Sequence, residues 1–221
     1  GADLGAEKFI DIKCRSAGIR PSAAVLVATI RALKFHGGVT REDLSEENLL
    51  ALRAGLANLN RHINNLRENY GVPAIVSINQ FVADTDAEVE LVMEHCKALG
   101  VQVALSSHWA NGGAGATDLA HMVAEICDAD TTSANTPHNS FVYPGELSLW
   151  EKLEAVATKV YHASEITASS KVRDRLKELT DGGYGHLPVC IAKTPYSFST
   201  DPALKGAPDG HVMDIREVRL S

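Results

Sequence analysis

Short apolar runs that alternate with helix-like segments are the feature that most constrains the fold of this chain. Three such runs, each bounded by turn residues, lie at residues 23–28, 74–78 and 101–105. The segments between them carry apolar side chains three and four residues apart, the spacing of amphipathic helices. Strands that alternate with helices predict an α/β fold with a mostly parallel sheet flanked by helices.

The same spacing predicts helices over residues 44–69, 85–99 and 117–127. Asp84 or Thr85 would cap the second helix, and Gly100 would end it. The polar, turn-rich residues 128–145 are interpreted as an exposed connection. Beyond them we expect helices at 147–161 and 169–179 and strands at 187–192 and 212–218. The organisation predicted is an α/β core over residues 1–130 and a smaller C-terminal α/β lobe over residues 131–221.

The composition of the chain argues against several classes of function. The chain has 221 residues, 45% of them hydrophobic, and a formal net charge of −7. A nucleic-acid partner is not expected, because phosphate binding needs a basic face. The four cysteines form no Cys-x-x-Cys pair, and no apolar run approaches the roughly 20 residues of a membrane span. We therefore expect no membrane association and a cytoplasmic location. The first residue is Gly1, so a fragment or processed product is expected.

Polar groups follow each of the three predicted strands. Ligands of open α/β sheets bind at the carboxyl ends of the strands, so these groups are expected to line one crevice. After the first strand come Arg31, Lys34 and His36. Arg31 and Lys34 would share a helix face and could neutralise an oxyanion, and His36 could transfer protons. The alternatives are a solvated helix face and a turn histidine.

After the second strand come Asn79, Phe81 and Asp84. An amide and a carboxylate at this place resemble the loops with which nucleotide-binding α/β proteins recognise a purine edge. The alternative is that Asn79 makes a turn and Asp84 caps the next helix.

After the third strand come Ser106, Trp109 and the glycines Gly112 and Gly113. A glycine-rich turn before a helix can present backbone N–H groups to an anion. Trp109 lies in a loop and could expose a flat surface for stacking, or could pack over the sheet edge as a structural residue.

Several common sites are not predicted. The nine histidines form no His-Glu-x-x-His cluster, so we expect no metal site. The sequence contains no Gly-x-Ser-x-Gly elbow, no Gly-x-Gly-x-x-Gly after the first strand and no Gly-x-x-x-x-Gly-Lys-[Ser/Thr] loop.

Longer stretches resemble one enzyme family. They are Gly-Ala-Asp-Leu-Gly-Ala-Glu-Lys-Phe at the start, Val-Ala-Thr-Ile-Arg-Ala-Leu-Lys-Phe-His-Gly-Gly at 27–38, Asn-Gln-Phe at 79–81 and Leu-Pro-Val at 187–189. Together they resemble the formate–tetrahydrofolate ligases, almost from end to end. Val82 and Asn111 depart from the family pattern, which usually has Pro and Lys there.

The resemblance implies an activity and site residues. Enzymes of the family use ATP with Mg²⁺ to convert formate to formyl phosphate, which N10 of tetrahydrofolate then attacks. It implies a fold with a P-loop-NTPase-like core, of which this chain would lack the P-loop part. Phe81, Leu105 and Trp109 match the residues that bind folate. Asn79, Asp84, Ser106, Gly112 and Gly113 are then the candidate nucleotide-binding residues, and Arg31, Lys34 and His36 the candidate catalytic ones.

The family's phosphate-binding segment would precede Gly1. The chain is therefore expected to carry the folate side of the site, to be inactive alone, and to work as a homo-oligomer or with an N-terminal complement. The alternative is a non-catalytic folate- or nucleotide-binding or assembly module derived from the same fold.

Overall fold

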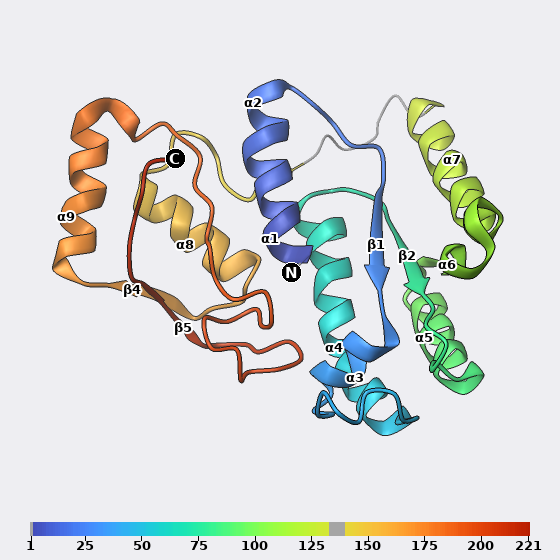
Figure 1. Ribbon diagram of the computed structural model, residues 1–221. Helices are drawn as coiled ribbons and strands as arrows, with labels where there is room; N and C mark the ends of the chain where they lie inside the picture. Colours follow the sequence, from blue (N-terminus) through green and yellow to red (C-terminus); the bar gives the residue numbers. More distant parts are fainter. Residues whose placement is uncertain (1, 133–139) are drawn as a thin grey trace. The chain divides into compact units, whose positions relative to one another are not determined.

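The computed structural model describes residues 2–132 and 140–221 (Figure 1). The chain divides into two compact units. Unit 1 comprises Gly1–Ile19 and Ser140–Ser221, and unit 2 comprises Arg20–Asn139. The N-terminal helix thus groups with the C-terminal part, whereas the sequence placed it in a domain of residues 1–130.

Unit 2 is built on a three-stranded parallel sheet, as predicted. Its strands β1 (Ala24–Ala28), β2 (Ala74–Asn79) and β3 (Gln102–Ser106) lie in the order β1-β2-β3. The helical elements of the unit are α3 (Ile30–His36), α4 (Leu49–Asn64), the π-helical turn η2 (Asn65–Asn69), α5 (Asp86–Ala98), α6 (His108–Asn111), the 3₁₀ turn η3 (Gly112–Ala116) and α7 (Thr117–Thr132).

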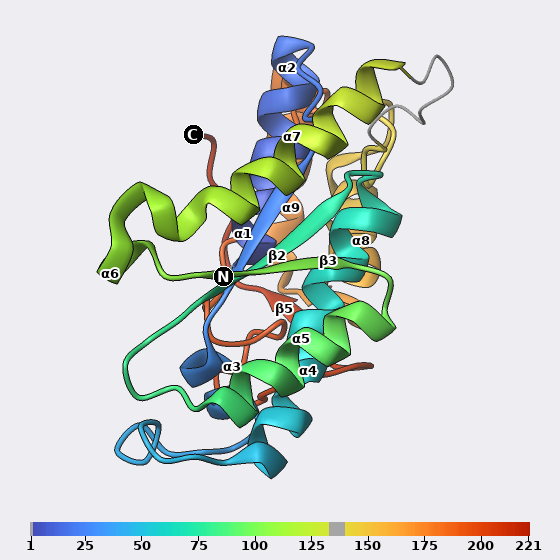
Figure 2. The same ribbon diagram turned by 90° about the vertical axis from the view of Figure 1, so that its right-hand side faces the viewer.

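Helices cover the two faces of this sheet. Helix α4 contacts β1, and α7 contacts β2 and β3. Figures 1 and 2 show α4 and α7 on opposite sides of the strands. The central strand β2 is accordingly buried from Ala74 to Ile78, which explains its continuous apolar sequence.

Side-chain caps fix where the helices begin. Of the two predicted caps, Thr85 is the one that caps α5, and it forms a capping box with Glu88. Helix α4 begins later than predicted, because the Asn48 side chain accepts a hydrogen bond from the Ala51 N–H and ends the preceding turns there. Helices α3 and α4 then cross so closely that a Cβ on Gly55 would lie 1.8 Å from the Leu33 carbonyl oxygen.

Unit 1 contains a two-stranded parallel sheet of β4 (Glu165–Ala168) and β5 (Val212–Ile215). Its helical elements are α1 (Ala2–Glu7), the π-helical η1 (Lys8–Cys14), α2 (Arg15–Ala17), α8 (Leu149–Lys159), α9 (Ser170–Leu179) and the π-helical η4 (Thr180–Tyr184).

The predicted strand at 187–192 is wrong. Pro188 has no N–H to donate, and side chains accept the neighbouring backbone hydrogen bonds. The Val189 N–H donates to the Tyr143 hydroxyl at 2.9 Å, and the Ile191 N–H donates to Glu7 Oε1 at 2.8 Å. The segment is therefore an extended connection held by buried side chains.

The interpretation of residues 128–145 as an exposed connection is also wrong in part. Helix α7 continues to Thr132, and Val142 and Tyr143 are buried in unit 1. Residues 133–139 lie outside the described part of the chain.

Candidate functional site

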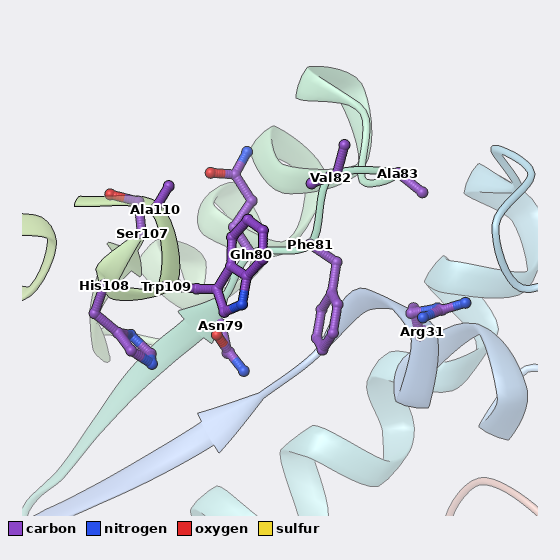
Figure 3. A pocket seen from close by; sticks show the side chains of 10 residues that line it. All are labelled: Arg31, Asn79, Gln80, Phe81, Val82, Ala83, Ser107, His108, Trp109 and Ala110. Atoms are coloured by element: carbon purple, nitrogen blue, oxygen red, sulfur yellow. The ribbon is translucent and has the colours of Figure 1, made fainter. Parts of the chain in front are cut away.

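The three strands of unit 2 end at one edge of the sheet. The parallel register sets Ala28 opposite Ile78 and Asn79 opposite Ser106, so the loops that follow the strands meet there. A cavity of about 610 Å³ lies at this edge, a volume within the usual range for small-molecule sites. It is lined by Arg31, Asn79, Gln80, Phe81, Val82, Ala83, Ser107, His108, Trp109 and Ala110 (Figure 3).

Two aromatic rings enter this cavity from different loops. Trp109 lies on α6 after β3 and is 80% exposed, and Phe81 lies in the loop after β2 and is 40% exposed. Figure 3 shows the two rings side by side, with Asn79 below Trp109 in this view. Exposed aromatic rings of this kind provide flat apolar surfaces for a planar ligand.

A tight turn holds the Trp109 loop. The Ser107 N–H donates to the Gly115 carbonyl at 3.0 Å, and the Asn111 amide donates to Ser107 Oγ at 3.0 Å. A Cβ on Gly115 would lie 2.5 Å from the Ser107 carbonyl carbon, so only glycine fits. Asn111 therefore has a structural role in this loop.

The Phe81 loop is closed by Asp84. Asp84 Oδ2 accepts a hydrogen bond from the Phe81 N–H at 2.8 Å. The Arg31 guanidinium lies 5.6 Å from the centre of the Phe81 ring. Val82, the residue after Phe81 in this loop, is 90% exposed.

Four of the predicted site residues line the cavity: Arg31, Asn79, Phe81 and Trp109. Lys34 does not, although it is one turn from Arg31. Its ammonium group is fully buried, 2.8 Å from Glu88 Oε1, and donates to the Glu46 carbonyl at 2.7 Å. Burial alone would raise the pKa of the Glu88 carboxyl, but hydrogen bonds from Lys34 and two backbone N–H groups hold this pKa below its usual value.

The other predicted residues are not among those that line the cavity. His36 makes an edge contact with the Phe35 ring at a centroid distance of 6.1 Å. Ser106 is buried, and its hydroxyl lies 2.7 Å from the Ser77 hydroxyl. Leu105 is 36% exposed on β3, and Gly112 and Gly113 belong to the η3 turn that follows α6.

Sequence reasoning missed the polar residues Gln80, Ser107 and His108, which also line the cavity. Only their position in the sequence could have indicated these residues, since each lies within two residues of the end of β2 or β3.

In residues 2–132 and 140–221, no three His, Cys, Asp or Glu side chains are grouped as a metal ion would require. Among the described helices, none has the length and apolar character needed to cross a membrane.

Comparison with known proteins identifies the family. The sequence model described as formate–tetrahydrofolate ligase matches residues 1–221. The chain is 58% identical over 221 residues to the formate–tetrahydrofolate ligase of Methylococcus capsulatus. It is 56% identical to that of Methylibium petroleiphilum and 55% identical to that of Rhizobium etli.

Each of these alignments covers the whole of this chain but only 38–39% of the relative. The chain thus spans less than half the length of the curated relatives it matches. A family match over every residue, together with identity above one half, is decisive for homology. The chain therefore belongs to the formate–tetrahydrofolate ligase family.

Proposed function

We propose that the cavity of unit 2 binds the pteridine ring of tetrahydrofolate and that this chain supplies the folate side of an ATP-dependent formate–tetrahydrofolate ligase. The observation that carries the proposal is the pair of aromatic rings, Phe81 and Trp109, which enter one cavity from two loops. A flat bicyclic ring would stack on them, and the Asn79 amide could pair with its polar edge. Leu105 would contribute apolar surface at the strand end.

The chemistry of the complete enzyme is assigned here by family membership. Formate and ATP would give formyl phosphate and ADP, and N10 of tetrahydrofolate would then attack the formyl carbon and displace phosphate. In this scheme unit 2 holds the folate while formyl phosphate is delivered to it. A homo-oligomer or a separate complementing segment would complete the site.

The residues described do not fit the phosphates of MgATP. The glycine turn at Gly112 and Gly113 has no lysine, and the 221 residues contain no Gly-x-x-x-x-Gly-Lys-[Ser/Thr] loop. We therefore derive no phosphoryl-transfer step from this chain. We expect the chain alone to bind tetrahydrofolate but to form no 10-formyltetrahydrofolate from formate and ATP.

Tryptophan fluorescence tests the folate site. The chain has two tryptophans, so Trp150→Phe leaves Trp109 as the single reporter. Tetrahydrofolate should quench it with a saturable curve, and Phe81→Ala should weaken binding about tenfold through loss of stacking and apolar contact. Phe9→Ala is a matched control, because Phe9 is 42% exposed but lies in unit 1.

The proposal fails if tetrahydrofolate leaves the Trp109 emission unchanged. It also fails if Phe81→Ala and Phe9→Ala bind with the same affinity as the parent chain. Saturable binding that depends on Phe81, combined with turnover by this chain alone, would contradict only the assignment of phosphate handling to another segment.

A further inference from the structure

Both hydrogen bonds that close the turn carrying Phe81 are made by one residue, Asp84. Asp84 Oδ2 accepts from the Phe81 N–H at 2.8 Å, and the Asp84 N–H donates to the Phe81 carbonyl at 3.0 Å. These two bonds close the four-residue turn from Phe81 to Asp84, which lies between β2 and the cap of α5. The direction of the Phe81 ring is therefore fixed by the conformation of a turn that Asp84 holds.

Asp84 itself is buried. Its residue exposure is 9%, and it is not among the side chains that line the cavity. The other carboxylate oxygen, Oδ1, has no hydrogen-bond partner within the described residues. Burial raises the pKa of this carboxyl and Glu88 raises it further, while the Phe81 N–H, Lys34 and Arg31 lower it. A buried carboxylate with one strong bond, to a backbone N–H, is suited to holding a loop.

Arg31, which also lines the cavity, contacts the same ring. Figure 3 shows the Phe81 ring between Trp109 on one side and Arg31 on the other. The guanidinium lies 5.6 Å from the ring centroid, within the range of a cation–π contact. The ring is thus backed by a cation and held at its backbone by a carboxylate.

We propose that Asp84 is a positioning residue for Phe81, and that it controls the affinity of the cavity for tetrahydrofolate through the Phe81 turn without touching the ligand. This inference rests on the proposed function. It replaces the hypothesis that Asp84 binds a nucleotide, because the buried carboxylate faces the Phe81 backbone.

Two substitutions separate positioning from ligand contact. Asp84→Ala removes the acceptor for the Phe81 N–H and should weaken tetrahydrofolate binding about tenfold, in proportion to a lost charge-assisted hydrogen bond. Asp84→Asn keeps an acceptor oxygen in the same place and should bind within about threefold of the parent chain. Asp86→Ala, an exposed carboxylate two residues away, is the matched control and should bind like the parent.

A double-substitution cycle with Phe81 gives a readout that a general loss of stability would not produce. If Asp84 acts through Phe81, then Asp84→Ala should cause no further loss of affinity in the Phe81→Ala background. Additive losses would overturn the proposal. So would equal losses in Asp84→Ala and Asp84→Asn, because these would place the charge itself against the ligand.

Hydrogen exchange of the Phe81 amide tests the turn without any ligand. Exchange should be at least about tenfold faster in Asp84→Ala than in the parent chain, with Asp84→Asn close to the parent. Unchanged exchange in Asp84→Ala would overturn the positioning role. A different result is that Asp84 protects the Phe81 amide from exchange but the chain does not bind tetrahydrofolate. That result would contradict the proposed function and would still support the role of Asp84 in the turn.

Discussion

At the residue scale, three buried carboxylates of unit 1 each have a polar partner from a later part of the chain. In unit 1, Asp3, Glu7 and Asp11 follow one another at four-residue intervals on the N-terminal helix, and all are buried. Lys193 lies 2.8 Å from Asp3 Oδ2, and the Val142 N–H donates to Asp11 Oδ1 at 2.9 Å. These carboxylates join the N-terminal helix to the later segments of unit 1.

Glu7 should make the stability of unit 1 depend on pH. Burial raises the pKa of its carboxyl from 4.5 to about 7, against the opposing hydrogen bonds from Tyr161 and Ile191. Between these two values the folded chain holds a proton that the unfolded chain has released, so stability should fall as pH rises through this window. The loss amounts to roughly 3 kcal/mol when it is complete.

Glu7→Gln should remove this dependence. In a Trp109→Phe background, urea unfolding followed by Trp150 emission gives the free energy of unfolding of unit 1 at pH 5 and pH 8, and the difference between the two pH values should be smaller with Glu7→Gln than without it. Glu165→Gln, on the exposed start of β4, serves as the control and should keep the parent's difference. A parent-like pH profile in Glu7→Gln would show that other groups carry the effect.

Lys34 should contribute to stability and not to catalysis. Its ammonium group and the Glu88 carboxylate are fully buried together. Lys34→Met should lower the free energy of unfolding by about 3–5 kcal/mol, because it leaves the buried Glu88 carboxylate without its cationic partner. Lys34→Met combined with Glu88→Gln should recover part of that loss in denaturant titrations. A loss below about 1 kcal/mol in the single variant would contradict the ion-pair assignment.

At the scale of elements, a strand that is buried on both faces is the easiest to predict from the sequence. Strand β2 is buried on both faces, so its apolar run was sufficient to find it. Strand β4 reads Glu-Ile-Thr-Ala over four residues and shows no such pattern, so it was missed. Residues 187–192 look like a strand but have their backbone bonded to Tyr143 and Glu7, partners far away in the sequence.

The candidate site likewise contains residues that the sequence predicts and contacts that it does not predict. Phe81, Asn79 and Trp109 could be predicted because position after a parallel strand determines which loops meet. The ion pair of Lys34 with Glu88 could not, because it depends on how α3 and α5 are placed by tertiary packing. Local spacing suggested only that Lys34 shares a face with Arg31.

The η3 turn should control how α6 presents Trp109. Gly115→Ala would push a methyl group against the Ser107 backbone, so the turn must shift. We expect tetrahydrofolate affinity to fall at least about tenfold, since small displacements of a stacking ring remove contact. Gly113→Ala is the matched control, because a Cβ there meets nothing within 4 Å. Equal affinities for the two variants in the Trp109 assay would contradict this role.

On the scale of the whole molecule, the two units carry one tryptophan each. Trp109 reports on the cavity of unit 2, and Trp150, under the Arg173 guanidinium at 4.1 Å, reports on unit 1. Every residue that lines the cavity belongs to unit 2. The single-tryptophan variants Trp150→Phe and Trp109→Phe therefore report on unit 2 and unit 1 separately.

Removal of residues 1–19 should affect the two signals differently. Unit 1 loses the helix that carries Asp3, Glu7 and Asp11, so the cooperative unfolding seen by Trp150 should weaken strongly or disappear. Quenching of Trp109 by tetrahydrofolate should persist with an affinity within about threefold of the parent chain. Loss of both signals together would mean that the units do not fold independently.

The sequence order of unit 1 has a consequence for synthesis. Its N-terminal helix leaves the ribosome before Arg20–Asn139, whereas Tyr161, Ile191 and Lys193, which satisfy its buried carboxylates, are translated after that segment. During translation unit 2 can therefore complete its sheet before the partners of these carboxylates have been made. We expect the carboxylates to stay hydrated until then, so that their burial is a late step in the folding of unit 1.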